Sequence, residues 1–274
     1  MNFGGIYPAH YLREATFVVV PVPYDLTSTY QPGSRRGPIA IIEASANMEL
    51  YDEELKKETY LTGIHTTLPV DVDARGPKNM IAAVRKKISK IVALDKIPVM
   101  LGGEHSISLG AVQALKEKYS GLSVLQLDAH ADLRDSYQGS PYSHASVARR
   151  ISELCPLVQV GIRSWEPNAR DFAEKHGVTI LRADQVDEIP AGIFSGPLYM
   201  SIDLDGLDPA FAPGVSHPEP GGLSTLDVLT MIRRIKGPLV GADVVELNPE
   251  RDPQMTTARV VVRLVKELAA KIAG

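Results

Sequence analysis

The sequence predicts an α/β fold in which a mostly parallel central sheet is covered by helices on both faces. Short apolar runs alternate with longer segments whose apolar residues recur at helical spacing. Several runs are continuously apolar, as expected for strands that are buried on both faces. Regular β-α alternation of this kind is typical of parallel sheets. No shift in composition marks a linker, so we expect residues 1–274 to form one domain.

The expected strands are rich in Val, Ile and Leu, which suit a buried pleated surface. They lie at residues 17–22, 96–101, 122–127, 157–162, 178–181, 198–202 and 239–245. A further extended segment is expected at residues 60–72. The loop after the first strand, residues 23–38, is long, polar and dense in turn-forming residues. Because it starts at a strand end, we expect it to form part of a pocket wall.

The expected helices alternate with these strands. In residues 77–93, for example, Ile81, Val84 and Ile88 recur at helical spacing, while lysines occupy the opposite face. Pro38 suits the first turn of a helix, where its missing N–H is not needed. Ser224 is a residue type that caps helix N-termini. The helices are expected at residues 38–46, 77–93, 106–119, 143–153, 167–176, 225–235 and 256–272.

The composition argues against several classes of protein. The net charge of -4 offers no basic surface for nucleic acid. The longest apolar runs are too short to span a membrane, and the N-terminus does not resemble a secretory signal. Cys155 is the single cysteine, which excludes an intrachain disulfide and fits a reducing compartment. We therefore expect a cytoplasmic protein in which Cys155 is a small, partly buried residue.

Three metal-capable side chains follow the apolar run at residues 123–127. They are Asp128, His130 and Asp132, which occupy alternate positions. In an extended segment such residues point to the same side. Two carboxylates and an imidazole facing one cavity would repel or stay unpaired unless a cation lay between them. The pattern predicts a divalent metal site, with a solvated loop as the alternative for this motif taken alone.

Other expected strands end in side chains of the same kind. His105 follows one strand, Asp203 and Asp205 end another, and Glu246 follows the last. Because the carboxyl ends of parallel strands lie at one edge of the sheet, we expect these groups to converge. Three strand ends with metal-binding chemistry make a chance match a poor explanation. Glu246, taken alone, is better interpreted as a solvated residue after a strand.

The candidate ligands are four carboxylates and two imidazoles, with no thiolate: His105, Asp128, His130, Asp132, Asp203 and Asp205. Such donors favour ions like Mn²⁺ over soft metals. Six ligands suit two ions roughly 3.5–4 Å apart. With a bridging hydroxide the site keeps one net negative charge, so we expect a cationic substrate. The predicted reaction is metal-assisted hydrolysis, in which His144 protonates the leaving group. The remaining histidines, His10, His65, His176 and His217, are expected to be structural or surface residues.

Three segments together resemble the signature segments of the ureohydrolases, the arginase/agmatinase family. They are residues 102–106, 128–132 and 201–214, with Gly221 and Gly222 downstream. The resemblance implies a three-layer α/β/α fold and two Mn²⁺ ions per chain. It assigns one ion to His105, Asp128, Asp132 and Asp203, and the other to His130, Asp128, Asp203 and Asp205.

The resemblance also implies the reaction. A hydroxide that bridges the two ions attacks a guanidino carbon, which releases urea and an amine. His144 matches the family's proton-shuttling histidine, and Glu246 matches the glutamate that holds the guanidinium. Family members usually assemble as trimers or hexamers, so we expect a homo-oligomer. Two positions depart from the pattern, since Glu104 stands where Asp is commoner and Ala145 where agmatinases often have Gly.

Two loops favour agmatine as the substrate and putrescine, a polyamine, as the product. Residues 133–143 resemble the agmatinase version of this stretch rather than the arginase version, which holds the α-carboxylate and α-amine of arginine. Residues 24–36 also resemble agmatinases. Aminopropylagmatine, guanidinobutyrate and arginine are the alternatives, because Arg134 or Arg163 could serve an acidic tail if either faced the pocket.

Three functions outside this family are alternatives. A dinuclear phosphoesterase would need an Asn-His pair on a later loop, which the sequence lacks. A deacetylase of the same fold binds one zinc ion with fewer aspartates. A guanidino-compound binding protein without activity is disfavoured by the complete set of ligands and by His144.

Overall fold

The computed structural model describes residues 2–7, 9–52 and 56–272. Its centre is a sheet in which eight strands pair in parallel among these residues. In spatial order they are β4 (Ile64–Thr66), β1 (Phe17–Val22), β5 (Ile97–Gly102), β10 (Leu239–Val245), β9 (Leu198–Asp203), β6 (Ser123–Leu127), β7 (Leu157–Val160) and β8 (Thr179–Leu181). A short antiparallel pair, β2 (Tyr51–Asp52) and β3 (Lys57–Glu58), forms a separate sheet.

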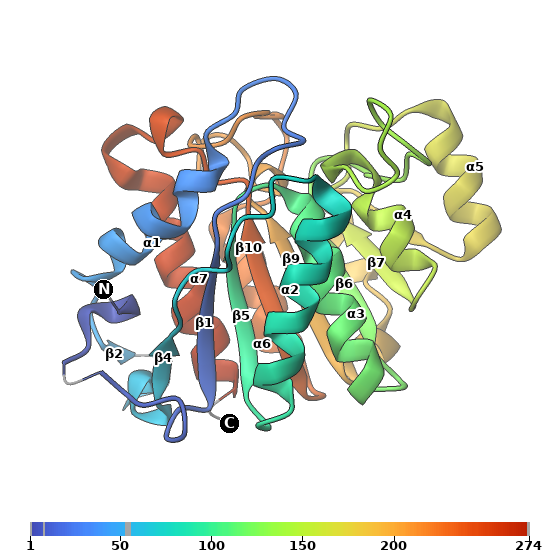
Figure 1. Ribbon diagram of the computed structural model, residues 1–274. Coiled ribbons are helices and arrows are strands. Elements are labelled where there is room, and N and C mark those ends of the chain that lie inside the picture. Colours follow the sequence, from blue (N-terminus) through green and yellow to red (C-terminus); the bar gives the residue numbers. More distant parts are fainter. Residues whose placement is uncertain (1, 8, 53–55, 273–274) are drawn as a thin grey trace.

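Helices cover both faces of the central sheet (Figure 1). One layer comprises α1 (Gly37–Ser45), α6 (Thr225–Arg234) and α7 (Thr256–Ile272). The other comprises α2 (Pro77–Val92), α3 (Ser108–Lys118), α4 (Val147–Ser152) and α5 (Pro167–His176). In β1, Phe17 and Val19 pack into the first layer and Val18 and Val20 into the second, because successive side chains point to opposite faces. The predicted three-layer α/β/α fold is confirmed.

Two predicted segments differ from the structure. The extended segment expected at residues 60–72 is a strand only in β4, because Thr59–Thr62 forms a 3-10 turn and Pro69 has no N–H for strand pairing. The helix expected at residues 143–153 begins only at Val147, since the three preceding residues form a 3-10 turn. Local turns of this kind override the broader hydrophobic pattern from which both segments were predicted.

The carboxyl ends of the strands form the upper edge of the sheet in Figure 1, where the long loop after β1 rises. The adjacent strands β5, β10, β9 and β6 form the middle of this edge. His105, Glu246, Asp203 and Asp128, in the same order, lie at or just after the ends of these strands. Because neighbouring strands are only about 4.8 Å apart, this order brings residues far apart in sequence into one site.

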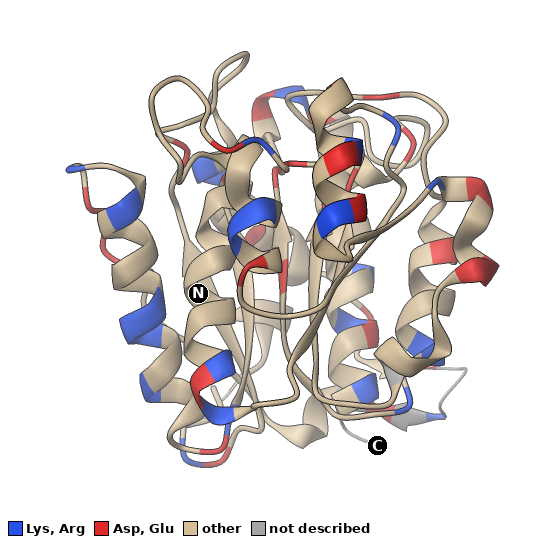
Figure 2. Ribbon diagram, turned by 90° about the vertical axis from the view of Figure 1, so that its right-hand side faces the viewer, with Lys and Arg blue, Asp and Glu red and all other residues tan. Residues whose placement is uncertain are grey.

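The surface carries charges of both signs, interspersed over the helices and loops in the view of Figure 2. Within the described part of the chain, no helix is long and apolar enough to cross a membrane.

Candidate active site

A cavity of about 310 Å³ opens at the carboxyl edge of the sheet. Loops that follow β1, β5, β6, β7, β9 and β10 build its wall. Seven predicted site residues line it: His105, His130, Asp132, His144, Asp203, Asp205 and Glu246. The eighth, Asp128, is fully buried beside them. The tertiary structure therefore brings together every residue that the sequence nominated for the site.

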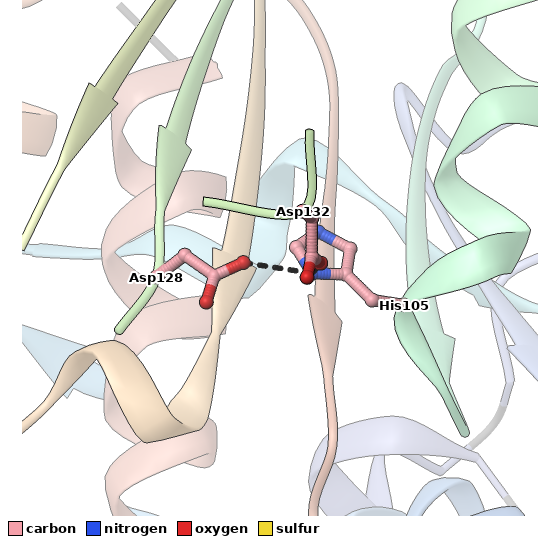
Figure 3. A group of neighbouring side chains, drawn as sticks. All are labelled: His105, Asp128 and Asp132. Atoms are coloured by element: carbon pink, nitrogen blue, oxygen red, sulfur yellow. Dashed lines mark ion pairs between the residues drawn. The ribbon is translucent and has the colours of Figure 1, made fainter. Parts of the chain in front are cut away.

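The first cluster surrounds the ring of His105, toward which the Asp128 and Asp132 carboxylates point in Figure 3. Nδ1 of His105 lies 3.1 Å from Oδ2 of Asp128 and 3.1 Å from Oδ2 of Asp203. Oδ2 of Asp132 is 3.5 Å from the same nitrogen. A Cβ on Gly103 would lie 2.0 Å from a carbonyl oxygen of the loop after β1. Only glycine lets the chain pass so close to that loop before it reaches His105.

Asp128 also belongs to a second cluster. Its Oδ1 is 3.7 Å from Nδ1 of His130, and that nitrogen lies 3.0 Å from Oδ2 of Asp205. The backbone N–H of His130 donates to Oδ1 of Asp128 at 2.6 Å, and the N–H of Ala129 donates to Oδ1 of Asp205 at 3.1 Å. A Cβ on Gly206 would lie 2.7 Å from the Asp128 nitrogen, so glycine allows the two strand ends to meet. One carboxylate thus serves both clusters.

The two clusters concentrate negative charge away from water. Burial raises the pKa of Asp128, Asp132 and Asp203, and neighbouring carboxylates raise it further. Burial also opposes the charged form of His130, but the charges of Asp205 and Asp128 outweigh it and raise the pKa of His130 to about 11. Burial likewise lowers the pKa of the imidazole in the first cluster, but the neighbouring carboxylates outweigh this effect and raise its pKa well above the usual value. The centre of the site therefore attracts positive charge.

A chain of hydrogen bonds behind the first cluster orients its imidazole. Asp243 is fully buried and accepts hydrogen bonds from the hydroxyl groups of Tyr199 and Ser201, the latter at 2.7 Å. Because the Ser201 proton is directed to Asp243, the Ser201 oxygen accepts from Nε2 of His105, 2.9 Å away. Nδ1 of His105 is then the ring nitrogen that can bind a cation held between it and the carboxylates. We call Asp243, Ser201 and His105 the His105 relay, an arrangement typical of metal-binding histidines.

Glu246 and Asp132 have left-handed backbone conformations, with φ of 68° and 51°. Such values are uncommon outside glycine and persist where the surroundings hold them. The N–H of Glu246 donates to the carbonyl of Gly103 at 2.8 Å, and its Oε1 accepts from the N–H of His105 at 2.8 Å. Burial raises the pKa of Glu246, and the charge of Glu104 adds to the effect. These contacts fix the Glu246 carboxylate where it lines the cavity.

The donor set fits divalent cations. Nδ1 of His105 is buried 3.1 Å from two carboxylate oxygens but has no partner in hydrogen-bond geometry, which is costly unless a cation lies between these atoms. Within the described residues, two sets of three ligand atoms lie within 4.8 Å of one another: His105, Asp128 and Asp132, and Asp128, His130 and Asp205. Cations bound there would displace the protons that the imidazoles otherwise take up. The residues therefore suit two ions that share Asp128.

Comparison with known proteins agrees with this geometry. The model of the arginase family matches residues 15–270. The chain belongs to the arginase family. The N(1)-aminopropylagmatine ureohydrolase of Thermus thermophilus is 39% identical over 265 residues, which cover 92% of this chain and 90% of that protein. The mitochondrial arginase 1 of Arabidopsis thaliana is 39% identical over 282 residues, which cover 94% of this chain and 82% of that protein.

A solved structure shows the same fold. The agmatine ureohydrolase of Thermoplasma volcanium superposes with a TM-score of 0.88 at 32% identity, covering 99% of this chain and 94% of that one. The resemblance inferred from the signature segments is thus confirmed. The chain is a ureohydrolase of the arginase/agmatinase family, a hydrolase that acts on guanidino compounds. Relatives with different substrates are equally similar to it, so overall similarity does not select the substrate.

His144, the ureohydrolase's predicted proton shuttle, lies on the cavity wall at the end of the loop after β6. Its Nδ1 lies 3.1 Å from Oγ1 of Thr27, and its backbone N–H donates to the same oxygen at 3.1 Å. Its ring meets that of Tyr137 edge-on, with centroids 5.8 Å apart. Burial lowers the pKa of His144 to about 4, and nearby histidines add to the effect. A neutral ring at physiological pH can accept a proton.

The two arginines considered for an acidic substrate tail differ in position. Arg163 donates to backbone carbonyl oxygens, including that of Asp205 at 2.7 Å, and is not part of the cavity wall. Arg134 lines the cavity, but its Nη1 lies 2.9 Å from Oε2 of Glu166. Among the described residues that form the wall, Arg134 is the one Lys or Arg, and its charge is balanced.

Some residues in or beside the cavity were not predicted from the sequence to belong to the site, among them His217, Thr27 and Glu104. His217, expected to be structural or on the surface, is exposed but also lines the cavity. Its ring centroid lies 4.8 Å from that of Tyr30 and 6.0 Å from that of His130. Its position just after the third signature segment was the only signal in the sequence. Thr27 and Glu104 gave no signal of their contacts, because those contacts join loops far apart in the chain.

Proposed function

We propose that the chain hydrolyses agmatine to putrescine and urea with two Mn²⁺ ions. In this proposal one ion is held by His105, Asp128, Asp132 and Asp203, and the other by His130, Asp128, Asp203 and Asp205. We further propose that residues 1–274 act as one ureohydrolase domain within a homo-oligomer, a trimer or hexamer, in the cytoplasm. The single Cys155 supports the reducing compartment.

The choice of substrate is supported by the charges in the cavity wall. Among the described residues, the wall contains five carboxylates, those of Asp132, Glu166, Asp203, Asp205 and Glu246. Its one Lys or Arg among the described residues, Arg134, is already paired with Glu166. The carboxylate of arginine or guanidinobutyrate would find no unpaired lysine or arginine there. Because an unpaired charge is costly in a partly desolvated site, a substrate with a cationic tail is favoured.

In the proposed mechanism Glu246 and His144 have separate roles. Two divalent cations held by the two clusters would lower the pKa of a water molecule, so that a hydroxide nucleophile would be available near neutral pH. Glu246 accepts hydrogen bonds from the guanidinium group and orients its carbon toward the clusters. Neutral His144 accepts a proton from the hydroxyl group once that group has bonded to the guanidino carbon, and passes the proton to the amine nitrogen. The C–N bond then breaks, and urea and the amine are released. The surrounding loops hold these groups at fixed positions, which lowers the entropic cost of reaching the transition state.

The deciding experiment is kcat/KM for urea release from agmatine, aminopropylagmatine, guanidinobutyrate and arginine at one Mn²⁺ concentration. We expect agmatine to be the best substrate. A tenfold preference for arginine or guanidinobutyrate, about 1.4 kcal/mol, would overturn the agmatine assignment but leave the ureohydrolase chemistry intact. Glu246→Gln is the matched control, because it keeps the shape of the side chain and should lower activity on every guanidino substrate.

Aminopropylagmatine is the second candidate. The Thermus thermophilus relative, 39% identical, is named as its ureohydrolase. The longer cationic tail would extend toward Trp165, which lines the cavity and is 42% exposed. Aromatic rings attract ammonium groups through cation–π contacts. In the same kinetic comparison, a higher kcat/KM for aminopropylagmatine than for agmatine would select this candidate.

Two measurements test the metal and the assembly. Metal analysis of the protein reconstituted with Mn²⁺ should approach two equivalents per chain. One equivalent with full activity would contradict the two-ion assignment. Light scattering coupled to size exclusion should give the mass of a trimer or hexamer, and a stable active monomer would exclude the proposed assembly.

A further inference from the structure

A fully buried carboxylate outside the predicted ligand set lies behind His144. Oε2 of Glu104 accepts the N–H of Thr27 at 2.6 Å and that of Ser28 at 3.1 Å. Oε1 accepts the hydroxyl of Thr27 at 2.6 Å and also that of Ser106. Each oxygen thus receives two donors. These four donors fill both oxygens of the ionised carboxylate, and in this form Glu104 acts as an acceptor alone.

These contacts fix the direction of the Thr27 hydroxyl. A hydroxyl group has one proton to donate and two lone pairs that accept. The proton is directed to Glu104. One lone pair accepts the backbone N–H of His144 at 3.1 Å, and Nδ1 of the same histidine lies 3.1 Å from the oxygen. Because the remaining lone pair can only accept, Nδ1 of His144 must carry a proton.

We propose that Glu104 is a positioning residue that sets the tautomer of His144 through Thr27. The neutral imidazole keeps its proton on Nδ1, so Nε2 is the nitrogen that accepts a proton from the cavity. In the proposed hydrolysis the transferred proton arrives and leaves at Nε2, while the proton on Nδ1 stays on that nitrogen and is donated to the Thr27 oxygen. The inference rests on the proposed shuttling role of His144. It parallels the His105 relay, in which a carboxylate also acts on an imidazole through a hydroxyl.

The tautomer can be read directly from two-bond proton–nitrogen correlations of protein labelled with ¹⁵N-histidine. The His144 signals are assigned by their loss in His144→Gln. The wild-type protein should show the proton on Nδ1, and a wild-type proton on Nε2 would overturn the proposal before any variant is made. Thr27→Val, which keeps the shape but removes the hydroxyl, should lose this preference. Thr27→Ser should retain it, and so should Thr29→Val, the matched change on the same loop.

Kinetics then separate hydrogen bonding from packing. Thr27→Val should lower kcat about 10–100-fold with KM and Mn²⁺ content close to wild type, as expected when an outer hydrogen-bond partner is lost. Thr27→Ser should recover most of the loss. Glu104→Gln should also favour the other tautomer, because its amide can donate to the Thr27 oxygen. Equal losses in Thr27→Val and Thr27→Ser would show that only the fit of the side chain matters and would refute the relay.

The spectra also separate this inference from the proposed function. If no guanidino compound is hydrolysed but the tautomer responds as expected, the positioning of His144 stands and the proposed function fails. If urea is released but Thr27→Val keeps both the wild-type tautomer and kcat within twofold, the function stands and the positioning role fails.

Discussion

Loss of the His105 relay should weaken metal binding without removing a metal ligand. Ser201→Ala deletes the oxygen that lies 2.9 Å from Nε2 of His105. Nothing then holds the proton on Nε2, and Nδ1 loses its fixed lone pair. Asp243→Asn should act at least as strongly, because its amide can donate to Ser201 and reverse the relay. A reversed relay places the proton on Nδ1, the atom that lies 3.1 Å from both Asp128 and Asp203.

The expected loss of Mn²⁺ affinity is about 10–100-fold, the usual effect of removing a ligand's hydrogen-bond partner. Each tenfold change corresponds to about 1.4 kcal/mol. At saturating Mn²⁺, metal-linked stabilisation should therefore fall by roughly 1.4–2.7 kcal/mol, because ligand binding stabilises the native state in proportion to the logarithm of [Mn²⁺]/Kd.

Competition with a metal-chelating indicator gives Kd, and thermal unfolding with and without Mn²⁺ gives the stabilisation. Ser216→Ala is the matched control. Ser216 lines the same cavity, but its hydroxyl donates to the carbonyl of Gln31 at 2.6 Å, away from the two clusters. Ser201→Ala with Mn²⁺ affinity within twofold of wild type would refute the idea that the relay prepares His105 for the metal.

Three further outcomes are expected. His144→Ala should lower kcat about 10²–10⁴-fold at unchanged Mn²⁺ content, and loss of metal on analysis would make His144 a ligand instead. Asp203→Ala should reduce urea release more than Asp205→Ala, because Asp203 contacts His105 and also accepts the N–H of Asp205 at 3.0 Å; equal losses would argue against this difference. Burial raises the pKa of Cys155 to about 11, so its side chain stays a thiol at pH 8. Cys155 should therefore react with iodoacetamide only after unfolding, and rapid alkylation of the native protein would contradict its buried position.

The sequence by itself determined the layers of the fold and nominated residues that the fold brings to one cavity. Its apolar runs and helical periodicities locate nearly every strand and helix, because burial on both faces of a parallel sheet leaves a strong local pattern. The sequence also indicated the chemistry of the site. The ligand types repeat at strand ends, and the carboxyl ends of parallel strands must share one edge.

Only the tertiary structure decided how those residues act. The order β5-β10-β9-β6 makes four strand ends neighbours, although they are far apart along the chain. The pairing of Arg134 with Glu166 and the contact of Glu104 with Thr27 join separate loops. The left-handed backbone of Glu246 depends on contacts with another strand end. The local sequence shows which side chains follow a strand. The charge balance and the tautomer of a side chain depend on neighbouring atoms that folding brings close, and these atoms belong to residues far away in the sequence.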